Sequence, residues 1–326
     1  MPSFRARLMN RFLRLTAKSL WKPGVDLAQL RAHVARVDRR MGRPTRVFPT
    51  EATEIAGVPA TWVGAPELEA RGTMLYLHGG AWVIHLPRTY LRFAGELSAR
   101  TGMRVLLPDY RLAPEHPFPA GADDCFAVYR WLVESGYPQR PFVIAGDSAG
   151  GNLSLVTLMR ARDAGLVLPD CGVLLSPATD ITLSGPSVRY NAVADVMFSP
   201  GAGELLPDLY CPGQPRTDPH ISPLHGEWAG LPPLLFHAGS TEMLLDDSVR
   251  AHDRARQAGT PADIEVFIDL PHVFHVIGWL PETRMALDGI AAFIERHAIA
   301  RPAPSMGPGD AGVAEIAVGE PAGGVL

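Results

Sequence analysis

The chain has 326 residues, of which 47% are hydrophobic and 20% charged, as is ordinary for a globular protein with a large core. No apolar run approaches the ~18–20 residues that a membrane-spanning helix requires, and the basic start of the chain is not followed by a signal-peptide pattern. The three cysteines, Cys125, Cys171 and Cys211, lie far apart and form no Cys-x-x-Cys pair, which argues against a disulfide framework and a zinc cluster. We therefore expect a protein of a reducing, cytoplasmic compartment.

The net charge of −4 conceals an uneven distribution. Residues 1–46 contain 12 of the 30 basic residues and 2 of the 34 acidic ones, so the remainder has 18 bases against 32 acids, a net charge of −14. Four apolar residues near the start have spacings that place them on one face of a helix: Phe4, Leu8, Phe12 and Leu15. We expect a basic amphipathic helix packed on an acidic body, with weak contact with a membrane surface as the alternative and no binding of nucleic acid.

In chain order, the first expected elements are two helices, over residues 3–20 and 26–41, with Asp26 as the N-cap of the second. An antiparallel hairpin follows, with strands over 51–55 and 59–63.

From residue 73 onward, short apolar runs typical of strands buried on both faces alternate with segments of helical spacing. The expected strands cover residues 74–77, 105–107, 142–145, 173–175, 234–237 and 264–268. The expected helices cover residues 90–101, 125–135, 152–164, 246–258 and 282–297. This alternation predicts an α/β protein with a doubly wound, mostly parallel sheet and helices on both faces.

Nearly sixty proline-rich residues between Leu175 and Leu234 interrupt this alternation. Such an interval is too long for a simple crossover, so we expect a cap insertion over about 180–222, above the carboxyl edge of the sheet. The predicted organisation is therefore a helical cap segment (1–48), a catalytic domain (49–298) and a tail (299–326). The tail is rich in Gly, Ala and Pro and is expected to be disordered.

The segment Gly146-Asp147-Ser148-Ala149-Gly150-Gly151 fits the pattern Gly-x-Ser-x-Gly. In this pattern a serine lies on a strained turn between a strand and a helix, and the glycines keep Cβ atoms out of a crowded space. An expected strand before the segment and an expected helix after it agree with this geometry. A phosphate-binding loop would instead require a Lys-Ser/Thr pair after the glycines. The pattern predicts that Ser148 is a nucleophile.

A second glycine motif, His78-Gly79-Gly80-Ala81-Trp82, directly follows an expected strand. Consecutive glycines let backbone N–H groups point into a cavity, so Gly79, Gly80 and Ala149 are expected to form an oxyanion hole. His78 precedes the nucleophile and lies inside this loop, which favours a structural role for its ring over a role as catalytic base.

The general base is expected after the last strand, because the nucleophile, the acid and the histidine follow in that order in sheets of this kind. Two histidines, His272 and His275, follow residues 264–268. His272 is nearer to the strand end, where the loop opens onto the site, and we expect it to be the base. We expect His275 to lie one helical turn further, against Trp279.

The acid should follow the strand at residues 234–237. Asp246 and Asp247 stand at the start of an expected helix, where capping and complementing the helix dipole is their ordinary role. Glu242 lies in the loop itself, where a carboxylate can fix the tautomer of the histidine. We favour Glu242 as the acid, with Asp246 as the alternative.

Together these motifs resemble the hormone-sensitive-lipase-like esterases, or bacterial family IV esterases, over about residues 45–298. The resemblance rests on His78-Gly79-Gly80, on Asp109-Tyr110-Arg111-Leu112-Ala113-Pro114-Glu115, on the serine motif and on Pro271-His272-Val273-Phe274. It implies an α/β-hydrolase fold in which the serine, the late histidine and the glycine motif have the roles given above. It also implies that residues 109–115 brace the oxyanion loop rather than take part in catalysis.

The chain departs from the family pattern at two places. Members usually have Asp-Pro-Leu-x-Asp-Glu around the acid, whereas here Glu242 stands at the position of the acid and Met243-Leu244 replace Pro-Leu. Members that look similar in this respect use a glutamate. The second departure is Ala81, where many members have a third glycine, and we expect little effect from it.

The resemblance implies hydrolysis of short- to medium-chain acyl esters through an acyl-enzyme, with no metal and no organic cofactor. A lactonase or an amidase is the nearest alternative, because one triad supports several acyl chemistries. A non-catalytic small-molecule receptor is the alternative of another class, which the presence of all three triad residues disfavours. The expected partner is a small-molecule ester, and a homodimer remains open. Four apolar residues are candidates for the pocket lining: Trp21, Trp82, Met197 and Phe198.

Overall fold

The protein is described by a computed structural model that covers residues 2–18, 24–41, 47–136 and 141–299. Its centre is one eight-stranded sheet with the order β1-β2-β4-β3-β5-β6-β7-β8. The strands are β1 (Thr50–Ile55), β2 (Val58–Val63), β3 (Thr73–Leu77), β4 (Arg104–Pro108), β5 (Phe142–Asp147), β6 (Cys171–Leu175), β7 (Leu234–Gly239) and β8 (Ala262–Phe267). Strand β2 pairs antiparallel with β1 and β4, and every other neighbouring pair is parallel. The sheet is thus mostly parallel, as predicted.

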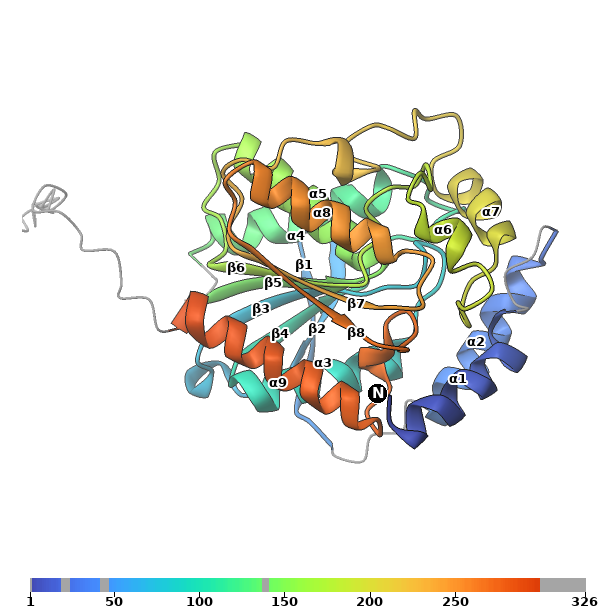
Figure 1. Cartoon of the computed structure of the whole chain (residues 1–326). Coiled ribbons are helices and arrows are strands. Elements are labelled where there is room, and N and C mark those ends of the chain that lie inside the picture. Colours follow the sequence, from blue (N-terminus) through green and yellow to red (C-terminus); the bar gives the residue numbers. More distant parts are fainter. Residues whose placement is uncertain (1, 19–23, 42–46, 137–140, 300–326) are drawn as a thin grey trace, which may run out of the picture.

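Helices cover both faces of this sheet (Figure 1). The helices are α1 (Phe4–Thr16), α2 (Leu27–Met41), α3 (Pro87–Thr101), α4 (Ala120–Glu134), α5 (Ala149–Asp163), α6 (Ser187–Tyr190), α7 (Pro200–Tyr210), α8 (Leu245–Gln257) and α9 (Pro281–Ile294). Helices α3 and α9 lie on one face, and α4, α5 and α8 lie on the other. In the part of the chain described, no helix is long and apolar enough to cross a membrane.

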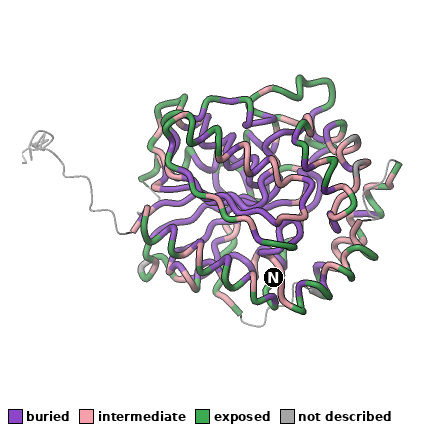
Figure 2. Tube along the Cα trace, viewed as in Figure 1, coloured by how far each residue is buried: buried purple, intermediate pink, exposed green. Residues whose placement is uncertain are grey.

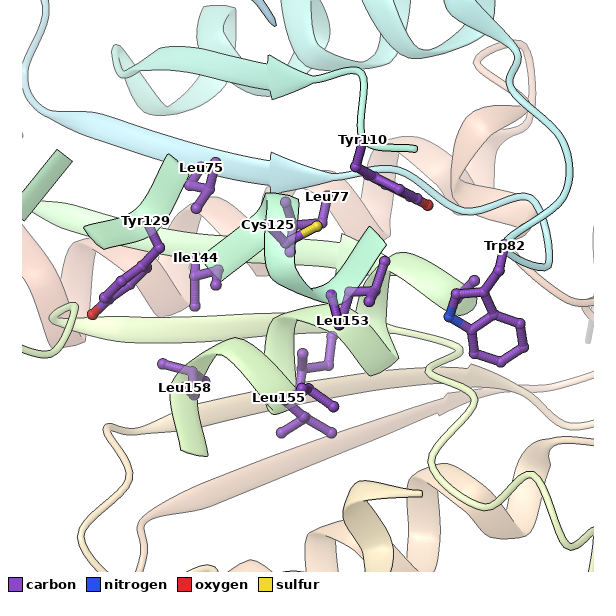
Figure 3. Close-up of a cluster of buried hydrophobic side chains, with 14 of the residues drawn as sticks. Leu75, Leu77, Trp82, Tyr110, Cys125, Tyr129, Ile144, Leu153, Leu155 and Leu158 are labelled. Carbon is purple, nitrogen blue, oxygen red and sulfur yellow. The ribbon is translucent and has the colours of Figure 1, made fainter. Parts of the chain in front are cut away.

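The largest apolar cluster lies between the sheet and helices α4 and α5 (Figure 3). Leu75 and Ile144 of the sheet face Leu153 and Leu158 of α5 there, and each of these side chains is at most 1% exposed. Twelve of the fifteen residues of α5 are buried, including the polar Asn152, Ser154 and Thr157, so the helix is enclosed on all sides except near its C-terminal end. The serine motif thus lies between a fully buried strand, β5, and a largely buried helix, α5. Buried residues also extend along the centre of the sheet (Figure 2).

The predicted strands and helices of the catalytic part are found with boundaries shifted by at most five residues. Strands β3 to β7 are buried along their whole length, as the uninterrupted apolar runs predict. Strand β8 is less buried, with only its first and last residues buried, because it is the last strand of the sheet. Ile268, predicted to end this strand, lies beyond it and is 60% exposed.

The N-terminal helix α1 packs on the body through a face that differs from the predicted one. Ala6 and Met9 are buried against an apolar cluster that includes Phe267 and Phe274. The stripe of Phe4, Leu8, Phe12 and Leu15, expected to face the body, is instead 55–75% exposed. The expectation of a helix packed through this stripe is therefore wrong: the small side chain of Ala6 allows close approach, and the larger apolar residues point away.

Helix α2 begins as predicted, because the Asp26 carboxylate accepts hydrogen bonds from the N–H groups of Ala28 and Gln29. At its other end, the buried Asp38 accepts hydrogen bonds from the N–H groups of Arg88 and Thr89, at the start of α3. Helix α2 is thus attached to the body by a carboxylate that caps another helix.

The interval between β6 and β7 forms an insertion that contains α6 and α7. These two helices lie beyond the same end of the sheet as α1 and α2 (Figure 1). The division into a cap segment (1–48), a catalytic domain (49–298) and a cap insertion (180–222) stays a prediction. Residues 300–326 of the predicted tail, and Trp21 of the predicted lining, lie outside the described residues.

Candidate active site

Ser148 lies on a strained turn between β5 and α5. Its backbone angles are φ 52° and ψ −119°, a conformation that non-glycine residues rarely adopt. The neighbouring glycines are required by close packing. A Cβ atom on Gly146 would lie 2.4 Å from the carbonyl oxygen of Gly150, and one on Gly150 would lie 1.9 Å from that of Leu77. This geometry lifts the serine side chain to the carboxyl edge of the sheet.

The structure brings Ser148, His272 and Glu242 into one hydrogen-bonded line. The Oγ atom of Ser148 lies 2.9 Å from Nε2 of His272, and Nδ1 of His272 lies 2.8 Å from Oε2 of Glu242. The three residues are 7%, 5% and 0% exposed, respectively. Their elements are far apart in the sequence, namely the elbow after β5, the loop after β8 and the loop after β7. Such a line can remove a proton from the serine while it attacks a carbonyl carbon.

Both oxygens of the Glu242 carboxylate are bonded. Oε2 faces His272, while Oε1 accepts hydrogen bonds from the Ser176 hydroxyl at 2.7 Å and from the Gly239 N–H. Asp246, the alternative acid, accepts instead from the N–H of Ser187 in the insertion. Asp247 accepts from the N–H groups of Thr179 and Asp180. Both aspartates lie in the first turn of α8, and neither is paired with His272.

The surroundings of His272 favour its protonated form. Burial acts to lower the pKa of His272, but the hydrogen bond and the charge of Glu242, followed by the charges of Asp195 and Asp147, outweigh burial and raise the pKa above 6.5. The ring of Phe198 meets the imidazole edge to face, with the ring centroids 5.0 Å apart. A base with a raised pKa and an apolar neighbour is suited to accepting a proton during a reaction and returning it afterwards.

The two predicted oxyanion glycines differ in their hydrogen bonding. The Gly79 N–H donates to Oδ1 of Asp147 at 3.0 Å, so this group is already bonded to a carboxylate. Among the described residues, no acceptor pairs with the N–H of Gly80 or with that of Ala149, the first residue of α5. The expectation that Gly79 donates to an oxyanion is corrected by this geometry. Its role is to hold the glycine loop on the serine elbow.

Asp147 is the acceptor that fixes this contact. It is 1% exposed and accepts hydrogen bonds from the hydroxyls of Tyr76 and Tyr90 as well as from Gly79. Burial is the main cause that raises the pKa of Asp147, and these three donors oppose it. A Cβ atom on Gly79 would lie 2.1 Å from Oδ2 of this carboxylate, so only glycine fits at that position.

His78 has the structural role that its position predicts. Its Nδ1 atom lies 2.7 Å from the carbonyl oxygen of Gly79, and its ring stacks on those of Tyr110 and His85 at centroid distances of 4.3 Å. Tyr110, from the segment 109–115, also donates to the carbonyl oxygen of His78 at 2.6 Å. His275 is buried beside His237 and Phe274, and Trp279, its expected neighbour, is 48% exposed.

One trio of described side chains has potential metal-ligating atoms within 4.8 Å of one another: His78, His85 and Asp109. The two imidazole rings stack with an interplanar angle of 15°. An imidazole nitrogen holds a metal in the plane of its ring, so two rings stacked face to face cannot both direct lone pairs at one ion. Nδ1 of His85 lies 3.0 Å from Oδ1 of Asp109 instead. These contacts link Asp109 to the glycine loop through the two histidines.

Three residues of the site were not identified from the sequence: Asp147, Ser176 and Asp195. Asp147 stands at a position that the serine pattern leaves free. Ser176 directly follows strand β6, and a polar residue at the carboxyl end of a central strand is a signal that could have found it. Asp195 lies in an insertion with no recognised motif, and only tertiary structure places it near the loop of Glu242.

The fold and the site together define a serine hydrolase. The family described as alpha/beta hydrolase fold matches residues 74–276. An acetyl-hydrolase from Streptomyces hygroscopicus is 36% identical over 252 residues, which span 76% of this chain and 83% of that protein.

Two solved structures are similar over nearly their whole length. An esterase from the bacterial hormone-sensitive lipase (HSL) family has a TM-score of 0.84 at 36% identity, covering 91% of this chain and 99% of that chain. EstE5 soaked by p-nitrophenyl butyrate has a TM-score of 0.84 at 36% identity, covering 90% of this chain and 99% of that chain. The chain belongs to the α/β-hydrolase family and, within it, to the hormone-sensitive-lipase-like bacterial esterases. It is a carboxylic ester hydrolase of the serine type.

Proposed function

We propose that the protein hydrolyses short- to medium-chain acyl esters through a triad of Ser148, His272 and Glu242. The observation that carries this proposal is the hydrogen-bonded line from the Ser148 hydroxyl through the imidazole to the Glu242 carboxylate, at 2.9 Å and 2.8 Å. Nucleophile and base are within direct reach of each other, and the base is oriented by a buried anion.

In the proposed reaction, Oγ of Ser148 attacks the ester carbonyl carbon while Nε2 of His272 accepts the hydroxyl proton. Glu242 holds the imidazole through Nδ1 and stabilises the imidazolium that forms. The N–H groups of Gly80 and Ala149 donate to the oxyanion of the tetrahedral intermediate. His272 then protonates the leaving alkoxide, and an acyl-enzyme remains on Ser148. Water attacks this ester with His272 again as base, which releases the carboxylic acid and restores the serine.

The apolar side chains near the triad support acyl groups of modest length. Phe198 contacts the imidazole of His272, and Trp82 of the oxyanion loop stacks on Tyr210 of α7, with the ring centroids 4.4 Å apart. Phe198 belongs to the insertion and touches the triad, so we expect it to limit the length of the acyl group. The names of two relatives support short acyl groups, since one is an acetyl-hydrolase and the other was soaked by p-nitrophenyl butyrate.

Hydrolysis of p-nitrophenyl acetate, butyrate, hexanoate and decanoate by the purified protein tests the proposal. We expect the highest kcat/KM for acetate to hexanoate and a fall at decanoate, and we expect Ser148→Ala to abolish turnover while leaving the fold intact by circular dichroism. Inactivity with all four esters would overturn the proposal. A lactone and an anilide in the same panel identify the alternatives, because higher kcat/KM for either would show a lactonase or an amidase.

A further inference from the structure

The exposed stripe of α1, formed by Phe4, Leu8, Phe12 and Leu15, is the feature that the esterase function leaves unexplained. These side chains are 73%, 58%, 55% and 75% exposed, although each is large and apolar. Their spacing places them on one face of a helix of 13 residues. Single exposed apolar residues are common on proteins, but four on one helix face indicate an interaction surface.

Helix α1 packs on the body through its other face. The exposed stripe therefore does not serve to pack α1 on the same chain. Ala6 and Met9 are 0% and 4% exposed and lie in the apolar cluster that includes Phe274. The Ser3 N–H donates to Glu282 at 2.6 Å, and the Asn10 amide donates to the carbonyl oxygen of Asp269 at 2.8 Å. Turning the stripe inward would break these contacts and expose the buried ones.

The charged residues of helix α1 itself are all of one sign. Helix α1 carries four exposed arginines, namely Arg5, Arg7, Arg11 and Arg14. The first acidic residue of the chain, Asp26, comes only after this helix. A second copy of the chain that packed its stripe on this one would place arginines of the two copies close together, and their like charges would repel. A nucleic acid would neutralise the arginines but would leave the apolar side chains in water. An anionic lipid surface satisfies both, since its headgroups pair with arginines and its acyl region takes up the apolar side chains.

We propose that α1 is a docking surface for an anionic lipid bilayer. The helix would lie in the plane of the interface, with Phe4, Leu8, Phe12 and Leu15 among the upper acyl chains and the flanking arginines at the headgroups. The absence of a spanning helix among the described residues fits binding at the surface rather than insertion across it. The proposal does not rest on the triad, because binding to vesicles is measured without turnover.

Contacts at the end of the helix connect this surface to the segment of the insertion that touches His272. The Arg14 guanidinium donates to the carbonyl oxygen of Val193, and the Lys18 ammonium donates to that of Asp195 at 2.8 Å. The Asp195 carboxylate in turn accepts from the Phe198 N–H at 2.9 Å, and Phe198 contacts His272. A bilayer at α1 would therefore lie close to the segment whose Phe198 contacts the imidazole of His272.

Co-sedimentation of the full-length protein with extruded vesicles tests the proposal. We expect binding to vesicles of phosphatidylglycerol and phosphatidylcholine in equal parts, and much weaker binding to phosphatidylcholine alone. The double variant Leu8→Ser/Phe12→Ser removes two outward apolar side chains and should weaken binding on the order of tenfold. Arg7→Gln/Arg11→Gln should weaken binding to the anionic vesicles by a similar factor and reduce its dependence on salt.

Val167→Ser is the matched control, because Val167 is 55% exposed but lies between α5 and β6, away from α1. It should bind vesicles like the unchanged protein. Circular dichroism melts show whether each variant is folded, and outward positions of the helix should leave the melting temperature unchanged. Failure of the unchanged protein to bind anionic vesicles would overturn the proposal, as would equal binding by Leu8→Ser/Phe12→Ser. A dimer in solution that this double variant dissociates would show that a second copy covers the stripe instead.

Discussion

Glu242 reaches the imidazole from a loop, and its carboxylate is completely buried with both oxygens bonded. A buried carboxylate is held as an anion only where donors surround it, and here the donors are the Ser176 hydroxyl, the Gly239 N–H and His272. The competing aspartates further along the chain are bonded to the insertion instead. The choice of acid therefore depends on which carboxylate the loop after β7 directs at the histidine.

We expect the pH profile of kcat/KM to fall on its acid side with a midpoint above pH 6.5. The neutral form of His272 is the proposed base, and its pKa is raised from 6.5 by Glu242 against the effect of burial. Activity is therefore present above this pKa and lost as the pH falls through it. Glu242→Gln should lower kcat/KM by about 10³–10⁴-fold and move the midpoint to lower pH. If Asp246→Asn had this effect and Glu242→Gln did not, the assignment of the acid would be wrong.

Ser176 is a positioning residue at the carboxyl end of β6. Its backbone has φ 49°, its hydroxyl donates to Oε1 of Glu242, and the same hydroxyl accepts from the N–H of Val273 at 3.2 Å. It thus ties the loop of the acid to the loop of the base. A strained residue at such a junction is consistent with a positioning role, because the strain is held by the surrounding contacts.

Ser176→Ala should lower kcat for p-nitrophenyl butyrate about tenfold with a smaller change in KM, because a lost hydrogen bond to a buried charge leaves Glu242 less firmly placed. The midpoint of the acid limb should also move, which loss of structure alone would not cause. Ser154→Ala is the control: Ser154 is equally buried, but its hydroxyl bonds within its own helix, to the carbonyl oxygen of Gly150. Equal kinetic effects of both variants would contradict the role assigned to Ser176.

At the scale of elements, α1 shows why a periodic pattern can predict a helix and still misplace it. The residues at 4, 8, 12 and 15 form the more apolar face, and the pattern favours that face as the buried one. The face that packs contains Ala6 and Met9, with the partly buried Leu13, which are fewer and smaller. The pattern cannot distinguish a face that packs on the same chain from one that another surface covers.

Met9→Ala should destabilise the protein by about 2–5 kcal/mol, because it leaves a cavity in the cluster between α1 and the body. Its neighbour offers a direct comparison, since Leu8 lies on the same helix and is 58% exposed. Leu8→Ala should change the free energy of unfolding by less than about 0.5 kcal/mol. Urea unfolding followed by circular dichroism measures both. A larger loss for Leu8→Ala than for Met9→Ala would mean that α1 packs through the predicted stripe after all.

The buried parallel strands were predictable because their apolar runs are uninterrupted. That Ser148, His272 and Glu242 come together was predictable because each stands at a fixed place relative to a strand end, and the three side chains are hydrogen-bonded in the structure. The hydrogen bonding of Gly79 was not predictable in this way. Its N–H direction depends on a contact with Asp147, 68 residues later in the chain. The sequence pattern also did not predict helices α6 and α7 of the insertion, because α6 has only four residues and α7 contains Pro207.

For the whole molecule, Asp195 is the point where the insertion meets the loops of the catalytic domain. Its buried carboxylate accepts hydrogen bonds from the N–H groups of Met197 and Phe198 in the insertion and from the N–H of Met243 beside Glu242. The Lys18 ammonium, just beyond α1, donates to its carbonyl oxygen. Asp195 thus joins the end of the N-terminal segment, the insertion and the loop of Glu242. A shift of the insertion is therefore coupled to a shift of this loop.

Asp195→Asn should therefore alter both stability and catalysis. An asparagine has one acceptor oxygen, so an N–H of Met243 or of Phe198 would face its NH₂ group, at a cost of about 1–3 kcal/mol. Asp195 is also one of the charges that raise the pKa of His272, so the acid limb of the pH profile should move to lower pH. Asp246→Asn, which also breaks a contact between the insertion and α8, should lower stability without this movement. Equal shifts of the acid limb in both variants, or none in Asp195→Asn, would show that Asp195 has no electrostatic part in the site.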